Sequence, residues 1–258
     1  MKISIITPSY NQGNFIEETI QSVISQKGSF ELEYFVIDGG SKDRTVDILK
    51  KYEGKLSWIS EPDNGQTHAI NKGLKKATGD IIAYLNSDDI YELGALRKVV
   101  HFFQKNPEKK WGYGKCRIIN ENGKEIRKWI TSYKNFLLKK YSYNKLLSEN
   151  FISQPATFFR RELLDEIGFF DEKQHLVMDY EYWLRIGEKY DAGVIDEYLA
   201  DFRWYTTSKS GGNFKKQFKE ELYIAKKYAH GKKLPILLHA FNYYKIVGMY
   251  SLLRFLQY

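Results

Sequence analysis

Short apolar runs alternate with longer amphipathic segments through the first third of the chain, and this alternation constrains the fold more than any other feature. The runs "KISIIT", "EYFVID", "LSWIS" and "DIIAYL" have the length and apolar character of buried strands. The segments between them carry apolar residues at helical spacing, as at Ile16, Ile20 and Val23. Strands that alternate with helices predict βαβ units. We therefore expect an α/β fold with a Rossmann-like, mainly parallel sheet and helices on both faces.

A polar loop follows each of these runs. In chain order the loops read "TPSYN", "DGGSKD", "EPDNG" and "NSDD", and the last three contain carboxylates. In a parallel α/β sheet, ligands bind beyond the carboxyl ends of the strands. We expect all of these loops to open at one edge of the sheet and to form the binding site there.

The second half of the chain predicts a less regular arrangement. The runs "WGYGKCRIIN" and "KEIRKWI" predict paired strands joined by the turn residues Asn122 and Gly123. The basic, aromatic stretch "YKNFLLKKYSYNKLL" is predicted to be helical, and a further helix opens at Asp179. In the first half, we expect Asn14 to cap the helix that begins at Phe15.

Composition indicates an ordinary globular protein. Of the 258 residues, 43% are hydrophobic and 28% are charged, which is typical of a soluble chain with one large domain or one domain and an appendage. The single cysteine, Cys116, cannot form an intramolecular disulfide, and Pro8 follows too short an apolar run for a signal peptide. We therefore expect a cytoplasmic protein.

The net charge of +8 is concentrated at the end of the chain. From Tyr205 onwards there are ten Lys or Arg and two Glu, whereas residues 1–204 carry 30 basic and 30 acidic residues. A basic end on a neutral body predicts attraction to an anionic membrane or nucleic acid, and a solvated charged helix is the simpler alternative. Since no nucleic-acid motif is present, we expect no nucleic-acid partner.

The last residues, 234–258, are apolar and predicted to be helical. Lys245 and Arg254 interrupt the run of about 20 apolar residues that a spanning helix needs, so we expect no crossing of the membrane. Polar residues recur at every third position, so two short helices that break near Gly248 would each be amphipathic. Such helices suit peripheral contact with a membrane, while packing on the body or in a homodimer are alternatives.

The adjacent carboxylates of Asp88 and Asp89 suggest a bound cation. A calcium loop needs a denser run of ligands, whereas an open Mg²⁺ or Mn²⁺ site takes one or two carboxylates and fills its other positions with phosphate and water. That site suits a diphosphate substrate. The alternative is that residues 86–89 cap a helix that starts near Tyr91.

Five segments in this order resemble the family 2 glycosyltransferases with the GT-A fold. They are "TPSYN", "VIDGGSKDRT", "EPDNGQTHAINKGLKKATGD", "YLNSDD" and "MDYEYWLR", and the resemblance covers residues 1 to about 210. It implies a GT-A domain over 1–210, followed from Gly211 and Gly212 by a basic and apolar helical extension over 211–258. It also implies a nucleotide-sugar donor, most typically a UDP-sugar.

The resemblance implies roles for residues of the first two loops. Tyr10 is expected to stack on the base of the donor, with Thr7 and Pro8 shaping the backbone around it. Asp38 is expected to accept a hydrogen bond from the base. An Asx turn with Gly39 is the alternative for Asp38, and the two roles are compatible.

The resemblance also implies roles around the diphosphate. Asp63 and Lys72 lie where the family closes over the nucleotide and diphosphate, and Arg203 and Lys209 are available to the diphosphate. These positions come from different parts of the chain. We expect the fold to bring them together.

The fourth loop departs from the family's Asp-X-Asp pattern, which here reads Asn86, Ser87 and Asp88. Asn86 replaces the acid that addresses the ribose, and an amide can still do so. Asp88 is the expected metal ligand, and Asp89 is expected to orient the loop from behind it. Because one direct carboxylate binds a metal weakly, we expect the metal and the donor to bind together.

Inverting transfer needs stabilisation of the departing diphosphate, which Mn²⁺ or Mg²⁺ at Asp88 would supply. It also needs a base for the acceptor hydroxyl, and Asp179 in "MDYEYWLR" matches the family's base motif. Helix capping is the alternative for Asp179.

Three positions carry a residue that differs from the family's usual one: His68, Gln154 and Tyr205. At Tyr205 a phenol replaces a histidine that can complete the metal site, which argues against a direct metal contact. Gln154 and Pro155 are expected on the acceptor side.

The sequence thus predicts a metal-dependent, inverting glycosyltransferase that acts on a glycan or lipid-linked acceptor in surface polysaccharide or glycoconjugate assembly. One alternative is a nucleotidyltransferase on a similar sheet, which would need basic residues that "TPSYNQGNF" lacks. The other is a catalytically silent module that binds nucleotide sugars.

Overall fold

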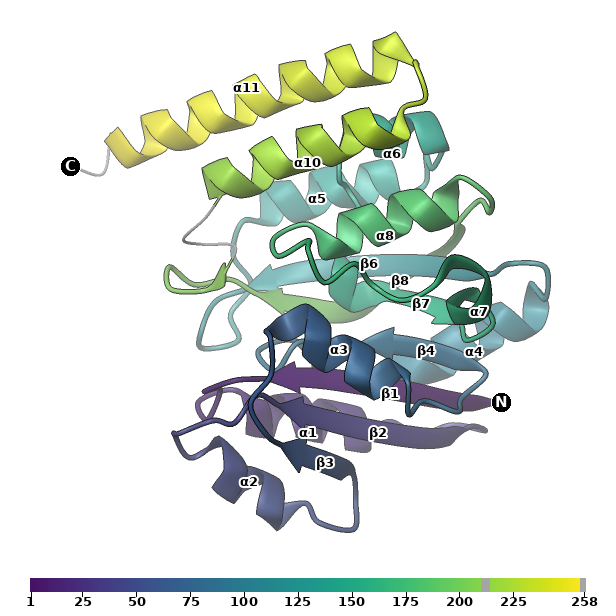
Figure 1. Cartoon of the computed structure of the whole chain (residues 1–258), viewed down its shortest axis with the longest axis vertical. Helices are drawn as coiled ribbons and strands as arrows, with labels where there is room; N and C mark the ends of the chain where they lie inside the picture. The colour runs from purple at the N-terminus through teal and green to yellow at the C-terminus, as the bar shows by residue number, and fades with distance from the viewer. Residues whose placement is uncertain (210–213, 256–258) are drawn as a thin grey trace.

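The computed structural model describes residues 1–209 and 214–255, with the backbone alone for Phe214 and for 249–255. Its centre is one eight-stranded mixed sheet in the order β3-β2-β1-β4-β7-β6-β8-β5. Helices cover both faces of this sheet (Figure 1). The predicted α/β class is confirmed. The predicted boundary at Gly211 and Gly212 lies outside the described residues.

Four parallel strands form the first half of the sheet. They are β1 (Lys2–Ser9), β2 (Glu31–Asp38), β3 (Ser57–Ser60) and β4 (Ile81–Tyr84). Ser9, Asp38 and Ser60 pair in register across the first three strands. The carboxyl ends of these strands therefore meet at one edge, as the sequence predicted.

The helices of this half pack on opposite faces. On one face, apolar residues of α1 (Ile16–Ile24), α2 (Thr45–Lys51) and α4 (Ala95–Lys105) pack against the sheet. On the other face lie α3 (Gln66–Leu74), α7 (Leu163–Ile167) and α8 (Met178–Gly187). Each buried strand therefore carries apolar residues in both directions, which explains the continuous apolar runs.

Two helix starts differ from the predictions. The N-cap of α1 is Phe15, and Asn14 instead accepts a hydrogen bond from Arg44 (3.1 Å), because the two loops that carry them meet. No helix starts near Tyr91, which lies in strand β5 (Ile90–Tyr91) paired with β8. The following helix, α4, begins at Ala95.

The second half of the sheet consists of β6 (Trp111–Ile119), β7 (Thr157–Arg160) and β8 (Gly193–Arg203). The predicted return strand "KEIRKWI" is wrong beyond its first residues, since it makes a single bridge, between Ile119 and Glu125. Helix α5 (Lys128–Leu138) takes up its remainder. Its buried positions are Thr131, Leu137 and Leu138, a spacing that places them along a helix rather than on one face of a strand.

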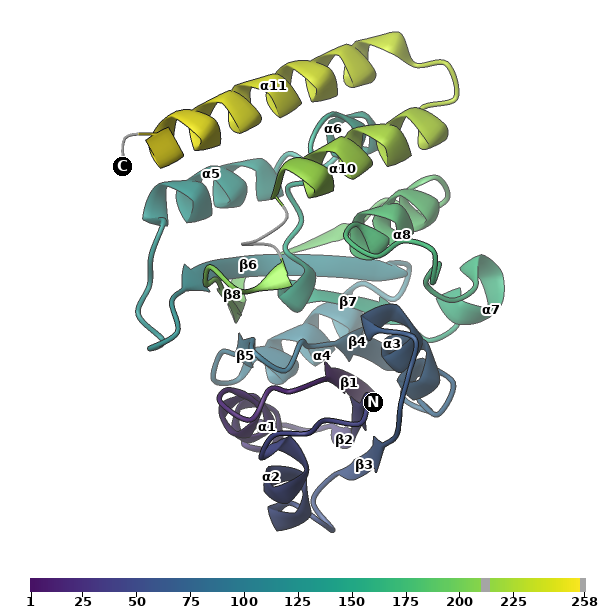
Figure 2. The ribbon, with the colours of Figure 1, turned by 60° about the vertical axis from the view of Figure 1, so that its left-hand side comes forward.

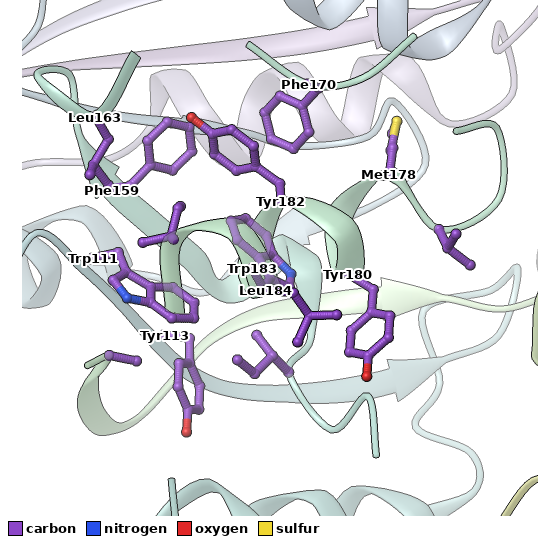
Figure 3. Packing of buried hydrophobic residues seen from close by; sticks show 14 of the residues in the cluster. Trp111, Tyr113, Phe159, Leu163, Phe170, Met178, Tyr180, Tyr182, Trp183 and Leu184 are labelled. Carbon is purple, nitrogen blue, oxygen red and sulfur yellow. The ribbon is translucent and has the colours of Figure 1, made fainter. Parts of the chain in front are cut away.

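Large aromatic side chains fill the space between this half of the sheet and α8 (Figure 3). Trp111 of β6 stacks on Trp183 of α8 with ring centroids 5.7 Å apart, and Tyr182 stacks on Phe170 at 4.1 Å. These contacts fix α8 on the sheet. The first turn of α8, which carries Asp179, is thereby fixed as well.

Helices α10 (Phe214–Tyr228) and α11 (Lys233–Phe255) form an outer layer over α6 (Tyr143–Ser148) and α8 (Figure 1). Helix α11 is continuous through Gly248, so the predicted break is wrong. A glycine inside a helix costs only about 1 kcal/mol, which packing can offset. His239 Nδ1 donates to the carbonyl oxygen of Leu147 (2.8 Å) and thereby ties α11 to α6.

Within 1–209 and 214–255, none of the helices is both long and apolar enough to cross a bilayer.

Candidate active site

One large cavity, of about 1640 Å³, opens at the edge where the parallel strands end. Its wall includes residues from all four predicted loops, among them Tyr10, Gly40, Asp63 and Asp88. The short 3₁₀ helix η1 (Gln154–Ala156), the start of α8 and the C-terminal helices complete the wall. The structure therefore joins segments from the whole length of the chain in one site.

The first loop presents an aromatic ring to this cavity. Pro8 and Tyr10 line the wall, and Tyr10 is 60% exposed. Thr7 is buried behind them, where its hydroxyl shares a 3.0 Å hydrogen bond with the hydroxyl of Tyr34. An exposed ring on a fixed loop suits stacking on a planar base.

The second loop is held together by Asp38. This buried carboxylate accepts hydrogen bonds from the hydroxyls of Ser41 (2.5 Å) and Ser60 (2.6 Å) and from the Ser41 amide (2.9 Å). Asp38 does not line the cavity, whereas Gly39 and Gly40 do. The predicted turn around Asp38 is present, and its contact with a base stays a prediction.

Asp63 lies against the second loop, and Lys72 lies farther from the cavity. A Cβ added to Gly39 would approach Asp63 Oδ2 to 2.9 Å, so the two loops touch closely only because residue 39 is glycine. Asp63 lines the cavity and accepts a hydrogen bond from the Gly65 amide (2.7 Å). Lys72 forms an ion pair with Glu61 and is not part of the wall.

The fourth loop is fixed by Asp89 and Asn86. Asp89 is buried and accepts hydrogen bonds from the main-chain amide of Arg203 (2.8 Å) and from Asn86 Nδ2 (3.1 Å). The Asn86 amide also bonds to Gln154 (3.1 Å) and to Gln66 (2.7 Å). Asp89 therefore holds this loop from behind, and its support of a metal ligand stays a prediction.

Asp88 faces the cavity beside Ser87. Its Oδ2 accepts a hydrogen bond from the Tyr205 hydroxyl (3.0 Å), and its main-chain oxygen accepts one from Arg203 Nε (2.7 Å). Burial raises the pKa of both Asp88 and Asp89, and the neighbouring charge of Asp88 adds to the increase at Asp89. The charge of Arg203 opposes both increases.

Arg203 is buried and bonded on several sides. Its Nη1 donates to the main-chain oxygens of Asn120 (3.1 Å) and Glu121 (2.9 Å), and its Nη2 donates to Glu18 (2.5 Å). The guanidinium thus connects the end of β8 to β6 and α1. In the described structure it positions the Asp88 loop, and its contact with a diphosphate stays a prediction.

Asp179 lines the cavity at the first turn of α8. Its Oδ1 accepts a hydrogen bond from the Tyr180 amide (2.8 Å), but the N-cap of α8 is Val177, without a side-chain capping bond, so the capping alternative is wrong. Burial nevertheless raises the pKa of Asp179, against the opposing charges of Lys209 and Lys134. A carboxylate with a raised pKa is a stronger base near neutral pH, which suits base catalysis.

Comparison with known sequences decides the family. The sequence model described as Glycosyl transferase family 2 matches residues 4–168. The chain belongs to this family of glycosyltransferases. An uncharacterized glycosyltransferase of Mycobacterium tuberculosis is 32% identical over 71% of this chain and 68% of its own length. The putative teichuronic acid biosynthesis glycosyltransferase TuaG of Bacillus subtilis is 28% identical over 83% of each chain.

Solved structures of similar proteins confirm the GT-A fold. Staphylococcus aureus TarS 1-349 in complex with UDP-GlcNAc has a TM-score of 0.66 and 20% identity, over 90% of this chain and 67% of that one. The mannosyltransferase PcManGT of Pyrobaculum calidifontis, in complex with GDP-Man and Mn²⁺, has a TM-score of 0.63 and 18% identity, over 97% of this chain and 79% of that one. This glycosyltransferase spans only 39% of the longer TarS structure.

The structure also adds residues that the sequence reasoning missed. Glu221 of α10 and His239 and Asn242 of α11 line the cavity of this glycosyltransferase. Glu221 is 4% exposed, and burial, with the charge of Asp179 adding to it, raises its pKa to about 7. The sequence carried a signal for Glu221, which lies in helical register with the buried Ile224 and is an acid on the apolar face of a basic helix.

Three further residues named from the sequence line the cavity, the acceptor-side Gln154 and Pro155 and the diphosphate candidate Lys209, whereas His68 does not. Gln154 and Pro155 line the cavity, and Gln154 Nε2 donates to the main-chain oxygen of Tyr84 (2.7 Å). His68 accepts a hydrogen bond from the Asn64 amide (3.3 Å) and is not part of the wall. Lys209 lines the cavity and donates to Gln66 (2.7 Å).

Proposed function

We propose that this glycosyltransferase transfers a sugar, with inversion, from a nucleotide diphosphate donor, most typically a UDP-sugar. The observation that carries the proposal is the single cavity that Asp88 and Asp179 both line. The structures with the same fold support it, because one contains UDP-GlcNAc and another contains GDP-Man with Mn²⁺.

The residues around Asp88 fit a Mn²⁺ or Mg²⁺ ion. Hard cations prefer oxygen ligands, and an Asp88 carboxylate that receives a phenol hydrogen bond supplies one. We assign Asp88 as the metal ligand and Asn86, Ser87 and Asp89 as the residues that set its direction. Such an ion, when bound, stabilises the charge on the departing diphosphate.

Asp179 is proposed as the catalytic base. The acceptor oxygen forms a bond to the anomeric carbon while the bond from that carbon to the diphosphate breaks, and the hydroxyl proton passes to Asp179. The raised pKa of Asp179 makes the carboxylate a better proton acceptor than an exposed aspartate. The attack from the face opposite the diphosphate produces the inversion.

The donor is held by the first, third and fourth loops in this proposal. Tyr10 stacks on the base beside Pro8, and Asp63 closes over the nucleotide. The four other predicted donor residues are assigned supporting contacts, since their side chains bond chiefly to other parts of the protein: Thr7, Asp38, Lys72 and Arg203.

A glycan or lipid-linked acceptor in surface polysaccharide assembly is proposed from the similarity to TuaG. Helix α11 supports peripheral contact with a membrane, because it turns apolar side chains outward next to exposed lysines, including Lys232 and Lys233. The exposed apolar side chains are those of Leu234, Leu237, Leu238, Phe241 and Tyr244.

The membrane contact is tested by flotation with vesicles of phosphatidylcholine with and without added phosphatidylglycerol. The doubly substituted chain Leu237→Gln, Phe241→Gln should lose binding to the anionic vesicles. Leu93→Gln, at an exposed leucine of another surface, should not. Equal flotation of the two variants would contradict the contact.

The donor assignment is tested by release of nucleoside diphosphate from a panel of UDP- and GDP-sugars with Mn²⁺. We expect release from at least one UDP-sugar, and a transferred sugar of inverted anomeric configuration by NMR. Binding without release would identify a silent module, and absence of binding by the whole panel would contradict the proposed function.

A further inference from the structure

The cavity continues beyond the donor loops into a second part between α5 and the pair α10–α11. Helices α5 and α10 lie between the sheet and α11 (Figure 2). The residues of this part that matter here are Trp129, Tyr133, Asn150, Gln217 and Glu221. It is thus built from segments that contain none of the predicted donor residues.

The rim of this part carries exposed aromatic rings. Trp129 is 57% exposed and lies one helical turn from Tyr133, whose hydroxyl donates to Glu149 Oε2 (2.9 Å). Both rings line the cavity, whereas the exposed Phe136 of the same helix does not. Aromatic faces in contact with water pack well against the apolar faces of sugar rings.

The deep end of this part carries polar groups. Asn150 Nδ2 and Gln217 Nε2 both donate to Glu221 Oε1, at 3.2 Å each. Among the described residues, Asn150 Oδ1 and Thr131 Oγ1 are buried in the wall without a hydrogen-bond partner. Since buried polar atoms in folded proteins are nearly always bonded, these atoms indicate a hydroxyl-rich ligand or water.

We propose that this part of the cavity is an acceptor subsite for a saccharide, in which Trp129 stacks on a sugar ring and Glu221 accepts a hydrogen bond from one of its hydroxyls. The proposal rests on the proposed function, because it assumes a glycosyl donor in the other part. It makes the C-terminal extension a component of the active site. A carboxylate bonded to a sugar hydroxyl makes a charge-assisted hydrogen bond, which also gives specificity.

The test uses the full chain and the UDP-sugar that reacts fastest in the donor panel. The acceptor probes are octyl glycosides of glucose, galactose, mannose and N-acetylglucosamine. Two rates are measured, transfer to the glycoside and release of UDP to water without a glycoside. The second rate reports on the donor part alone.

Glu221→Gln keeps an oxygen for Asn150 and Gln217 but loses the charge. We expect it to raise the KM for the best glycoside about tenfold or more, with kcat changed less and UDP release to water unchanged. Trp129→Ala should also raise the KM. Because the Trp129 side chain is largely exposed, we expect this substitution to leave the fold intact. Thermal unfolding of each variant checks the fold.

Two matched controls accompany these variants. Glu220→Gln alters the neighbouring acid of α10, which lies near Lys216 (3.9 Å) outside the cavity wall. Phe136→Ala removes an exposed ring of α5 that is not in this wall. Both controls should keep the wild-type KM.

Three results would overturn the subsite. They are an unchanged KM in both Glu221→Gln and Trp129→Ala, equal effects in the controls, and transfer to none of the glycosides while UDP release to water is intact. Absence of UDP release in the wild-type chain would instead overturn the proposed function.

Discussion

The two parts of the cavity are built in different ways. The donor part consists of loops at the ends of parallel strands, which main-chain pairing holds in register at Ser9, Asp38 and Ser60. The proposed acceptor part consists of side chains on α5, α10 and α11 and of Asn150, which come together through packing between distant segments. A local sequence pattern therefore determines the first part, whereas the second depends on the tertiary structure.

The largest expected effect is on the transfer rate, and it should leave donor binding almost unchanged. Asp179→Asn removes the proposed base but keeps a side-chain oxygen that can accept from the Tyr180 amide. We expect the transfer rate to fall about 10² to 10⁴-fold with the donor affinity within about twofold of wild type. Time-course assays of sugar transfer measure the rate, and calorimetric titration of the UDP-sugar measures the donor affinity. A transfer rate close to wild type would remove Asp179 from the mechanism.

A second effect concerns the acceptor part alone. The pKa of Glu221 is about 7, above its ordinary value of 4.5, with Lys134 of α5 and Asp179 of α8 facing it. Between pH 4.5 and about 7, folding is therefore accompanied by uptake of a proton at Glu221. The contribution of Glu221 to the free energy of unfolding consequently decreases as the pH rises through this range. Glutamine does not titrate.

We therefore compare the free energy of unfolding of Glu221→Gln with that of wild type at each pH. This difference, variant minus wild type, should be larger at pH 8 than at pH 5 by roughly 2–4 kcal/mol. Denaturant unfolding at the two pH values measures this difference. Glu220→Gln is the control and should show no comparable change. A stability difference that does not vary with pH would mean that Glu221 ionises normally.

The smallest effect concerns the attachment of α10. Tyr228 donates to Glu181, a buried carboxylate of α8 that also binds Arg185 (2.9 Å). Tyr228→Phe should lower the free energy of unfolding by about 1–3 kcal/mol and weaken the acceptor part, with donor affinity unchanged. Tyr223→Phe, on the exposed face of α10, is the control. Weakened donor binding in Tyr228→Phe would show that the two parts are coupled.

The features of the donor part are the ones that the sequence could predict. The strands of the first half and the loops at their ends follow from apolar periodicity and from the geometry of parallel sheets, whereas the order of the strands was not predicted. Asp88, Asp89 and Asp179 were predicted as site residues because the family's motifs contain them, and burial raises the pKa of all three.

The remaining features depend on contacts between distant segments. The burial of Glu221 requires α10 to pack beside Asn150, and no local pattern specifies that neighbour. Likewise, no local pattern specifies the contact of α11 with α6 through His239. Thr7, Asp38 and Lys72 were predicted as donor contacts, but none of the three lines the cavity, and their side chains bond to other parts of the protein.

The central claim is that Asp88 joins the protein to the donor through a divalent cation. The most direct measurement is calorimetric titration of the reacting UDP-sugar into wild type and Asp88→Asn, each with Mn²⁺ and with a chelator. We expect Mn²⁺ to tighten binding to wild type at least about tenfold and Asp88→Asn to lose this gain. Equal affinity with and without Mn²⁺ in the wild-type chain, or a gain that persists in Asp88→Asn, would contradict it.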